Sequence, residues 1–212
     1  MKRLSIVLLF VLLVFAYPSK GQTKLNSQQQ EQVQNIINSA TASMKVMQCD
    51  FVQTKKMNLL KKEMVSNGIM YYSSPGKLRW QYTKPYEYIF VLNGDRVSIK
   101  SSKSTQKINV NENKMFRQLS NIILNSVTGG HLKSSADFDV EIWKNNTTYT
   151  ATLWPKKKEL KKLYKSIEIS FNTSLTMVET VKMEETTGDV TIVNLKNVKI
   201  NHPIREELFS IN

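Results

Sequence analysis

Two histidines are the side chains of this sequence best suited to act as a general base near neutral pH, and neither stands in a catalytic pattern. His131 follows a glycine pair and His202 precedes a proline, contexts typical of solvated loops. Metal-ligand spacings and a glycine-rich phosphate loop are absent from the sequence. The acidic pairs at 184–185 and 206–207 are adjacent residues, which point to opposite faces of a strand. We therefore expect a protein that is not an enzyme and that uses no metal or cofactor.

The clearest structural signal is an alternation of apolar and polar residues between positions 68 and 99. Leu78, Trp80 and Tyr82 alternate with polar neighbours, which is the period of a strand with one apolar face. Pro75-Gly76 precedes this strand, and Asn93-Gly94 indicates a type I′ hairpin turn after the next one. The stretch predicts three consecutive antiparallel strands whose aromatic face needs an apolar cover.

Helical periodicity occurs in two places. Ser27 and Gln30 have the spacing of a capping box, and the apolar residues that follow predict a helix over 28–45. A second helix is predicted over 111–127, where apolar residues cover more of the circumference than a surface helix needs. Because it lies between strands in the sequence, we expect it to cross the concave face of the sheet as a lid. The predicted lid residues are Met115, Phe116, Leu119, Ile122 and Ile123.

The remaining chain is mostly strand by pattern. The charged segment 55–63 is predicted to be a hairpin turn or an irregular edge, and strands alternate with turns from residue 138 to a short last strand at 208–211. About ten strands and two helices predict a mainly β (α+β) protein with a curved antiparallel sheet or open barrel. Such a sheet would curl around an apolar interior.

Many apolar strand positions share one face, whereas only two amphipathic helices can cover it. A fully packed core is one interpretation; a partly filled cavity is the one we favour, and it would hold an elongated apolar guest at roughly 0.8 kcal/mol per methylene. An aromatic, basic sheet could also stack single-stranded nucleic acid, but the export signal described next argues against that. The predicted cavity-lining residues are Met47, Cys49, Phe51, Met70, Leu78, Trp80, Tyr82, Phe90 and Leu92.

The first 21 residues have the pattern of a secretory signal peptide. A basic start is followed by an uncharged run from Leu4 to Ser19, too short to span a bilayer, and small residues precede a cleavage site at Gly21-Gln22. Residues 22–212 are expected to form a single exported domain. Cys49 is the only cysteine, so no internal disulfide can form and packing must stabilise the fold.

The formal net charge is +13, and removal of Lys2, Arg3 and Lys20 with the signal leaves 13 − 3 = +10. This excess favours contact with anionic surfaces, which for an exported protein are lipid head groups or an acidic partner. The lysine-rich segment Lys156 to Lys165 is expected to be a solvated turn or a protected sheet edge rather than a docking patch.

Several segments, taken in order, resemble the periplasmic outer-membrane lipoprotein carrier family of the LolA type. They are the strand with Phe51 and Gln53, the segment GIMYYSSPGKLRWQY with Pro85 after it, the Asn93-Gly94 turn, and the late segment VKMEETTGDVTIVNLKNVKIN before Leu208-Phe209. The similarity is collinear from about Gln28 to the end of the chain.

The resemblance implies an open antiparallel β half-barrel with a helical lid over an apolar cavity. It also implies a periplasmic chaperone that takes acylated lipoproteins from an inner-membrane ATP-driven releasing complex to an outer-membrane acceptor, and so serves outer membrane biogenesis. By position, Leu78, Trp80 and Phe90 match apolar cavity residues of that family. Ser74 departs from it, because the best-known branch has an arginine before this proline that holds the lid closed.

Within this interpretation we expect a monomer that binds no nucleic acid. The alternative is a periplasmic binding protein for a free lipid, a glycolipid or a lipid-linked pigment precursor, because the same half-barrel would serve. An exported hydrolase would need a nucleophile and a base that the sequence does not offer.

Overall fold

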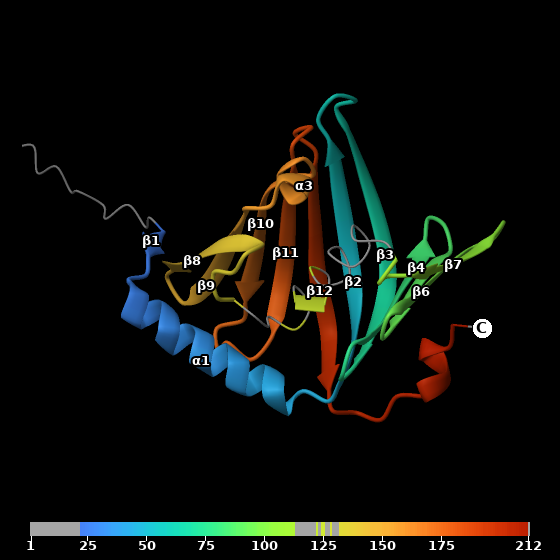
Figure 1. The fold of residues 1–212 in the computed structure, drawn as a ribbon, viewed down its shortest axis with the longest axis horizontal. Helices are drawn as coiled ribbons and strands as arrows, with labels where there is room; N and C mark the ends of the chain where they lie inside the picture. Colours follow the sequence, from blue (N-terminus) through green and yellow to red (C-terminus); the bar gives the residue numbers. More distant parts are fainter. Residues whose placement is uncertain (1–21, 113–121, 123, 126–127, 129–131, 212) are drawn as a thin grey trace, which may run out of the picture.

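The computed structural model describes residues 22–112, 122, 124–125, 128 and 132–211. In this part of the chain, twelve strands form one antiparallel sheet beside a single long helix (Figure 1). The elements are β1 (Thr23–Lys24), α1 (Ser27–Ser43), β2 (Val46–Met57), β3 (Lys62–Ser73), β4 (Lys77–Lys84), β5 (Tyr88–Asn93), β6 (Arg96–Ser101), β7 (Thr105–Asn109), β8 (Phe138–Asn145), β9 (Thr148–Pro155), α3 (Lys158–Lys161), β10 (Tyr164–Phe171), β11 (Val178–Glu185), β12 (Val190–Ile200) and the 3-10 helix η1 (Glu206–Phe209).

The strand order brings the two ends of the domain together in the middle of the sheet. The order is β1-β8-β9-β10-β11-β12-β2-β3-β4-β5-β6-β7, so β12 pairs with β2. Leu195 lies opposite Phe51 and Val193 opposite Gln53 along this seam. The two edge strands, β1 and β7, do not pair with each other, and the sheet stays open. The prediction of an open antiparallel sheet is confirmed.

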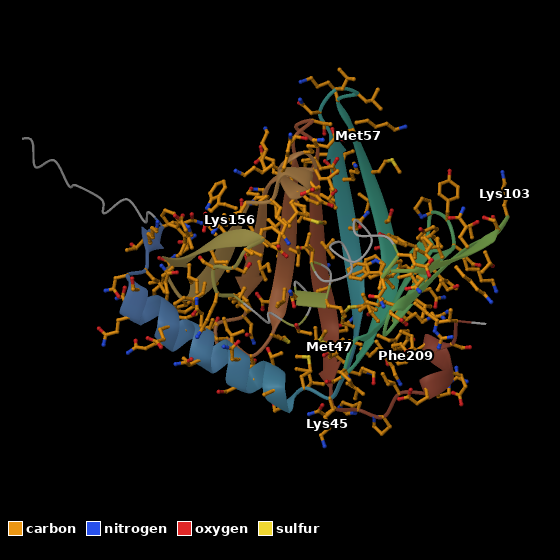
Figure 2. All side chains as sticks on the ribbon, viewed as in Figure 1. Lys45, Met47, Met57, Lys103, Lys156 and Phe209 are labelled. Atoms are coloured by element: carbon orange, nitrogen blue, oxygen red, sulfur yellow. The ribbon has the colours of Figure 1, made fainter. Side chains whose placement is uncertain are left out.

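The apolar core lies on one face of this sheet. Alternate residues of the central strands are buried there, and the helix α1 crosses the end of the β8–β11 half (Figure 1). Val33 and Ile37 of α1 belong to the same buried cluster as Ile142 and Ile169 of the strands. Figure 2 shows the side chains on this framework. One helix thus covers one half of a long sheet, and the other half needs a different cover.

The start of α1 is one residue earlier than the sequence pattern indicated. Asn26, not Ser27, is the N-cap: its side-chain oxygen accepts from the Gln29 backbone N–H at 2.9 Å. The Gln29 side chain accepts in return from the Asn26 N–H at 3.0 Å. The pairs Asn26–Gln29 and Ser27–Gln30 both have capping-box spacing. Asparagine is among the strongest N-cap residues, so Asn26 takes the N-cap position.

The structure corrects one predicted turn and decides between two alternatives for another segment. Gly94 has a positive φ of 61° and sits with Asp95 between the paired residues Asn93 and Arg96. A single positive φ at the first central residue is typical of a type II′ turn, not of the predicted type I′ turn. For the segment 55–63 the hairpin-turn alternative is confirmed at residues 58–61. The irregular-edge alternative is wrong, because β2 and β3 pair in unbroken register from Val46–Ser73 to Met57–Lys62.

The last predicted strand is also wrong. Residues 206–209 form the 3-10 helix η1, which packs on the outer face of the sheet and buries Phe209. The Phe209 carbonyl accepts from the Asn93 side chain at 3.1 Å, and the Leu208 carbonyl accepts from Arg79 at 3.2 Å. Docking on β4 and β5 satisfies these carbonyls without a strand partner.

The lysine-rich segment contains the short helix α3 between β9 and β10. Lys156 pairs with Asp139 at 3.2 Å, and Lys157 pairs with Asp137. Lys165 pairs with Glu184 at 3.0 Å. These ion pairs are largely solvent-exposed and contribute little to stability.

One close approach fixes how β2, β3 and β4 fit together. Gly68 of β3 lies under the ring of Phe51, its register partner on β2. A Cβ atom at position 68 would lie 2.4 Å from the Phe51 ring and 2.1 Å from the Gln81 backbone oxygen. Because a backbone atom is one of the two obstacles, only glycine fits.

We predict that Gly68→Ala lowers the free energy of unfolding by about 1–3 kcal/mol, because the added methyl group forces the strands apart. Urea denaturation followed by circular dichroism measures this change. The matched control is Ser66→Ala, two residues earlier on the same strand. Equal stability of the two variants would contradict the close approach.

Cys49 gives a second test of the packing. Its thiol is 1% exposed, and burial, with a smaller contribution from Asp50, raises its pKa to about 12. We predict that iodoacetamide labels the folded protein at least about a hundredfold more slowly than the urea-unfolded protein. Because the folded pKa exceeds the unfolded value of roughly 8.5, the thiol's contribution to stability is complete below that pH and is lost as the pH rises through about 12. Cys49→Ala should remove this component, and rapid labelling of the folded chain would refute the burial.

Candidate functional site

The nine residues predicted to line a cavity all lie on one face of four neighbouring strands, β2 to β5. They fall into three rows that cross the strands in register. The rows are Met47, Tyr72, Leu78 and Leu92; then Cys49, Met70, Trp80 and Phe90; then Phe51, Gly68, Tyr82 and Tyr88. Since strand residues two apart share a face, the alternation in the sequence is what placed them together.

Burial divides these rows into a packed floor and a half-exposed part. Met47, Cys49, Phe51, Met70, Leu78 and Leu92 are each at most 2% exposed. Trp80, Tyr82 and Phe90 are only partly buried and pack against that floor. The half-exposed aromatic side chains are the ones that a bound apolar molecule could contact without displacing the floor.

The aromatic side chains contact one another across three strands. The Phe51 ring lies 4.5 Å from Trp80 and 5.1 Å from Tyr82, measured between ring centroids. Tyr82 in turn lies 5.9 Å from Tyr88, edge to face. Such edge-to-face pairs stabilise the cluster beyond simple burial. The result is a continuous aromatic surface from β2 to β5.

The polar atoms in this surface are few. The Tyr82 hydroxyl donates to the Gln53 side-chain oxygen at 2.9 Å, and burial raises the pKa of both Tyr82 and Tyr88. Both phenols are therefore neutral at physiological pH. The Trp80 indole nitrogen is buried and finds no acceptor within normal hydrogen-bond geometry in the described residues. The surface presents no charge of its own to a guest.

Residues of several other strands extend this face, and sequence reasoning did not identify them. Tyr72, Tyr88 and Ile99 continue the rows within β3, β5 and β6. Val193 and Leu195 adjoin Gln53 and Phe51 across the β12–β2 seam. The alternation of Val193 and Leu195 was visible in the sequence, but nothing there indicated which strand they would meet.

The predicted lid helix is described only in part. Ile122 is helical, buried and part of the core cluster, and Leu124 packs against that cluster. Met115, Phe116, Leu119 and Ile123 lie outside the described residues. Helix α1 contacts the same part of the chain: Thr41 donates to the Thr128 carbonyl at 2.8 Å.

Among the described residues, the Ser74 side chain forms no hydrogen bond to the region of the predicted lid. Ser74 is exposed, and its backbone N–H donates to the Lys45 carbonyl just beyond α1 at 2.8 Å. A second hydrogen bond, besides that of Thr41, joins α1 to the chain just after the predicted lid helix. The buried Gln34 side chain donates to the Leu132 carbonyl at 2.9 Å. Backbone carbonyls at 128 and 132, rather than a charged side chain at 74, thus tie the lid region to α1.

Two hollows that are bounded by described residues have no aromatic side chain in their walls, although Cys49 lines one of them. One of about 470 Å³ lies beside Gln48, Asp50 and Asn197, where Asn197 donates to Asp50 at 2.7 Å. Another, of about 340 Å³, runs along α1 beside Gln30 and Gln34. Both have mixed polar and apolar walls.

The part of the chain that the structure describes offers neither a metal site nor a membrane-spanning helix. No group of three or more histidine, cysteine, aspartate or glutamate side chains is arranged to hold a metal ion there. Within the same residues, no helix is both long and apolar enough to cross a membrane.

Solved structures share this fold at low sequence identity. The MucA/MucB complex of Pseudomonas aeruginosa matches with 11% identity and a TM-score of 0.50, covering 84% of this chain and 60% of that chain. A LolA superfamily protein from Nitrosomonas europaea matches with 10% identity and a TM-score of 0.44, covering 84% and 97%.

Sequence comparison identifies relatives over most of the chain. A protein of Chromohalobacter salexigens is 24% identical over 145 residues, and one of Cupriavidus taiwanensis is 27% identical over 149 residues. Both are named outer-membrane lipoprotein carrier protein. Each match covers 68% of this chain and 66% or 65% of the relative, so the chain spans about two thirds of the length of these curated relatives. The model of the family "Outer membrane lipoprotein carrier protein LolA" matches residues 42–212, and the chain belongs to this family.

Proposed function

We propose that the protein is a periplasmic carrier that binds the acyl chains of lipoproteins on the concave face of its half-barrel and moves them from the inner to the outer membrane. The observation that carries this proposal is the half-exposed aromatic surface of Trp80, Tyr82 and Phe90 above a fully packed apolar floor. Membership of the lipoprotein carrier family supports the choice of cargo.

The uncharged aromatic surface suits an acyl chain on energetic grounds. Each methylene transferred from water to an apolar contact contributes about 0.8 kcal/mol. The lid residues Met115, Phe116, Leu119, Ile122 and Ile123 would occupy this surface when cargo is absent. Acyl chains then replace one set of apolar contacts by another, and the net free energy of binding stays small. A carrier that must also release its cargo needs that balance.

The contacts between α1 and the lid region support a lid that opens at modest cost. Thr41 and Gln34 each contribute one hydrogen bond to a backbone carbonyl, at 128 and at 132. A neutral hydrogen bond contributes about 1 kcal/mol net, less than the buried pairing of an arginine would. In this chain, where Ser74 stands at the position of the family arginine, these bonds would hold the lid.

The proposal includes partners and a location. An inner-membrane ATP-driven complex would load the carrier and an outer-membrane acceptor would unload it, so the carrier itself needs no catalytic residue. Residues 1–21, which lie outside the described part of the chain, would direct its export and be removed.

We predict that Phe90→Glu weakens binding of a fluorescent triacylated lipopeptide at least tenfold, because an acyl chain would have to desolvate a carboxylate. Phe90 is preferred to Leu78, which is fully buried, so that a charge there would also unfold the protein. The matched control is Ile89→Glu, on the same strand and similarly half-buried, but on the opposite face. Fluorescence titration measures both affinities.

Two results would count against the proposal. Equal weakening by Phe90→Glu and Ile89→Glu would remove the concave face from the binding site. Binding of free phospholipid, but not of lipopeptide, by the unaltered protein would replace lipoprotein by free lipid as the cargo.

A further inference from the structure

The hairpin that joins β2 and β3 projects beyond the rest of the sheet (Figure 1). Pairing of β3 with β4 stops at Asn67 and Lys84, whereas pairing of β3 with β2 continues to Lys62 and Met57. Residues 62–66 therefore extend past β4 by roughly 16 Å, at about 3.3 Å per residue. The projecting part ends in the turn 58–61.

Large apolar side chains are exposed on this projection. Leu59 is 90% exposed and Leu60 is 66% exposed, both within the turn. Met64 and Val65 follow on β3, at 43% and 50%. A single exposed leucine needs no explanation, but Leu59 and Leu60 lie next to each other at the turn and form an apolar apex of the kind that marks an interaction site. Met64 and Val65 are adjacent strand residues, so each face of the hairpin beside the apex carries one more exposed apolar side chain.

Lysines surround this apolar tip. Lys56 precedes the turn, and Lys61 and Lys62 follow the two leucines; all three are exposed. Glu63 is the only acidic residue between positions 56 and 65. An apolar apex with a basic collar is complementary to a bilayer surface, because leucines can enter the acyl boundary while lysines contact anionic head groups.

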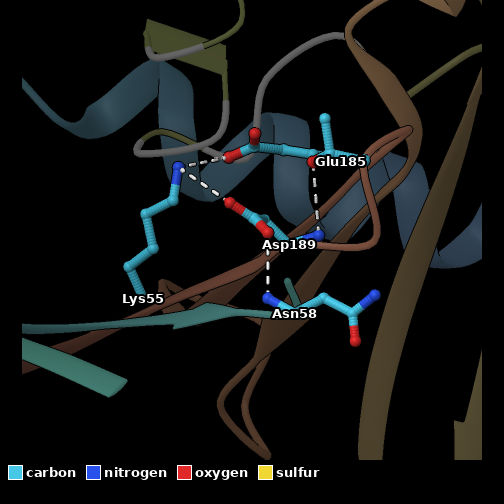
Figure 3. Close-up of polar contacts among 5 residues, drawn as sticks. Lys55, Asn58, Glu185 and Asp189 are labelled. Carbon is cyan, nitrogen blue, oxygen red and sulfur yellow. Dashed lines mark hydrogen bonds and ion pairs between the residues drawn. The ribbon is translucent and has the colours of Figure 1, made fainter. Parts of the chain in front are cut away.

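The neighbouring hairpin holds the tip in its outward position (Figure 3). The Asn58 backbone N–H donates to Asp189 of the β11–β12 turn at 3.0 Å. Lys55 forms ion pairs with Glu185 at 2.9 Å and with Asp189 at 3.7 Å, and the hydrogen bond that Lys55 donates to Glu185 raises the pKa of Lys55. A Cβ atom on Gly188 would lie 2.8 Å from the Asn58 side chain, so the two turns are in close contact. The leucines are displayed on a supported turn rather than on a loose loop.

We infer that the β2–β3 tip, defined as residues 56–65, docks the protein on the surface of an anionic phospholipid bilayer. The shape favours a bilayer over a protein partner, because the tip is a convex projection with its apolar side chains at the apex and charges around them. The inference does not depend on the cargo proposal, since docking at the tip needs neither the concave face nor an acyl chain.

A label at the apex tests this inference. Leu59→Cys adds an accessible thiol, and Cys49 is too buried to react, so an environment-sensitive fluorophore labels the tip alone. We expect a blue shift and a rise in emission with vesicles of phosphatidylethanolamine and phosphatidylglycerol. Vesicles of phosphatidylcholine, or high salt, should reduce both changes. Ile36→Cys is the matched control, because Ile36 is 48% exposed and belongs to α1. Helix α1 lies at the opposite end of the sheet from the β2–β3 turn (Figure 1).

Flotation with the same vesicles gives the second measurement. Leu59→Asp combined with Leu60→Asp should lower the vesicle partition coefficient at least tenfold, a change of about 1.4 kcal/mol. Lys61→Gln with Lys62→Gln should lower it and flatten its salt dependence, whereas Ile36→Asp should leave it unchanged. Phe90→Glu should bind vesicles like the unaltered protein, which separates this inference from the cargo proposal.

The inference fails if the labelled tip responds equally to both kinds of vesicle, or if Ile36→Asp matches the leucine variants. It also fails if the unaltered protein does not float with anionic vesicles. In that last case, photo-crosslinking from position 59 to an envelope protein would assign the tip to a protein partner instead.

Discussion

An open antiparallel sheet with one apolar face is the constraint on which the rest of this structure depends. The sheet does not close into a barrel, so its own strands cannot cover the apolar rows that run from β2 to β5. Helix α1 covers the other half, through Val33 and Ile37. The partly buried aromatic side chains of the remaining half are therefore the part of this face that a further cover or an apolar guest could contact.

The seam between β12 and β2 makes this arrangement possible. It inserts the C-terminal strands between the N-terminal helix and the aromatic meander, so that the packed half and the half-exposed part belong to one continuous core. The same seam brings the β11–β12 turn beside the β2–β3 turn, where Asp189 holds Asn58. The strand order thus determines both how the apolar floor packs and where the β2–β3 tip lies.

Much of the concave face could be predicted from the sequence, because strand periodicity determines which residues share a face. Leu78, Trp80 and Tyr82 alternate, and the short connection 85–87 between β4 and β5 places them opposite the alternating residues Leu92, Phe90 and Tyr88. Sequence periodicity does not encode partners from distant strands, so the approach of Val193 to Gln53 could not be anticipated. It also cannot choose between two overlapping capping boxes, which is why Asn26 took the place predicted for Ser27.

A hairpin turn within 55–63 was one of the two predicted alternatives, but its long paired strands and its projection were not predicted, for a different reason. Lysines at 55, 56, 61 and 62 interrupt any apolar alternation, and a charged run is normally read as a turn. The strands there are set by backbone pairing with β12 and by the Asp189 contact, both of which are tertiary. Local sequence therefore shows the composition of the tip but not its length or its projection.

The central claim is that the concave face carries acyl chains of lipoproteins. Native mass spectrometry of the mature protein, released from periplasm without detergent after co-expression with a lipoprotein, tests it most directly. The account predicts an adduct with the mass of one acylated lipoprotein. A clean mass of the unloaded protein, or an adduct of free lipid alone, would contradict it.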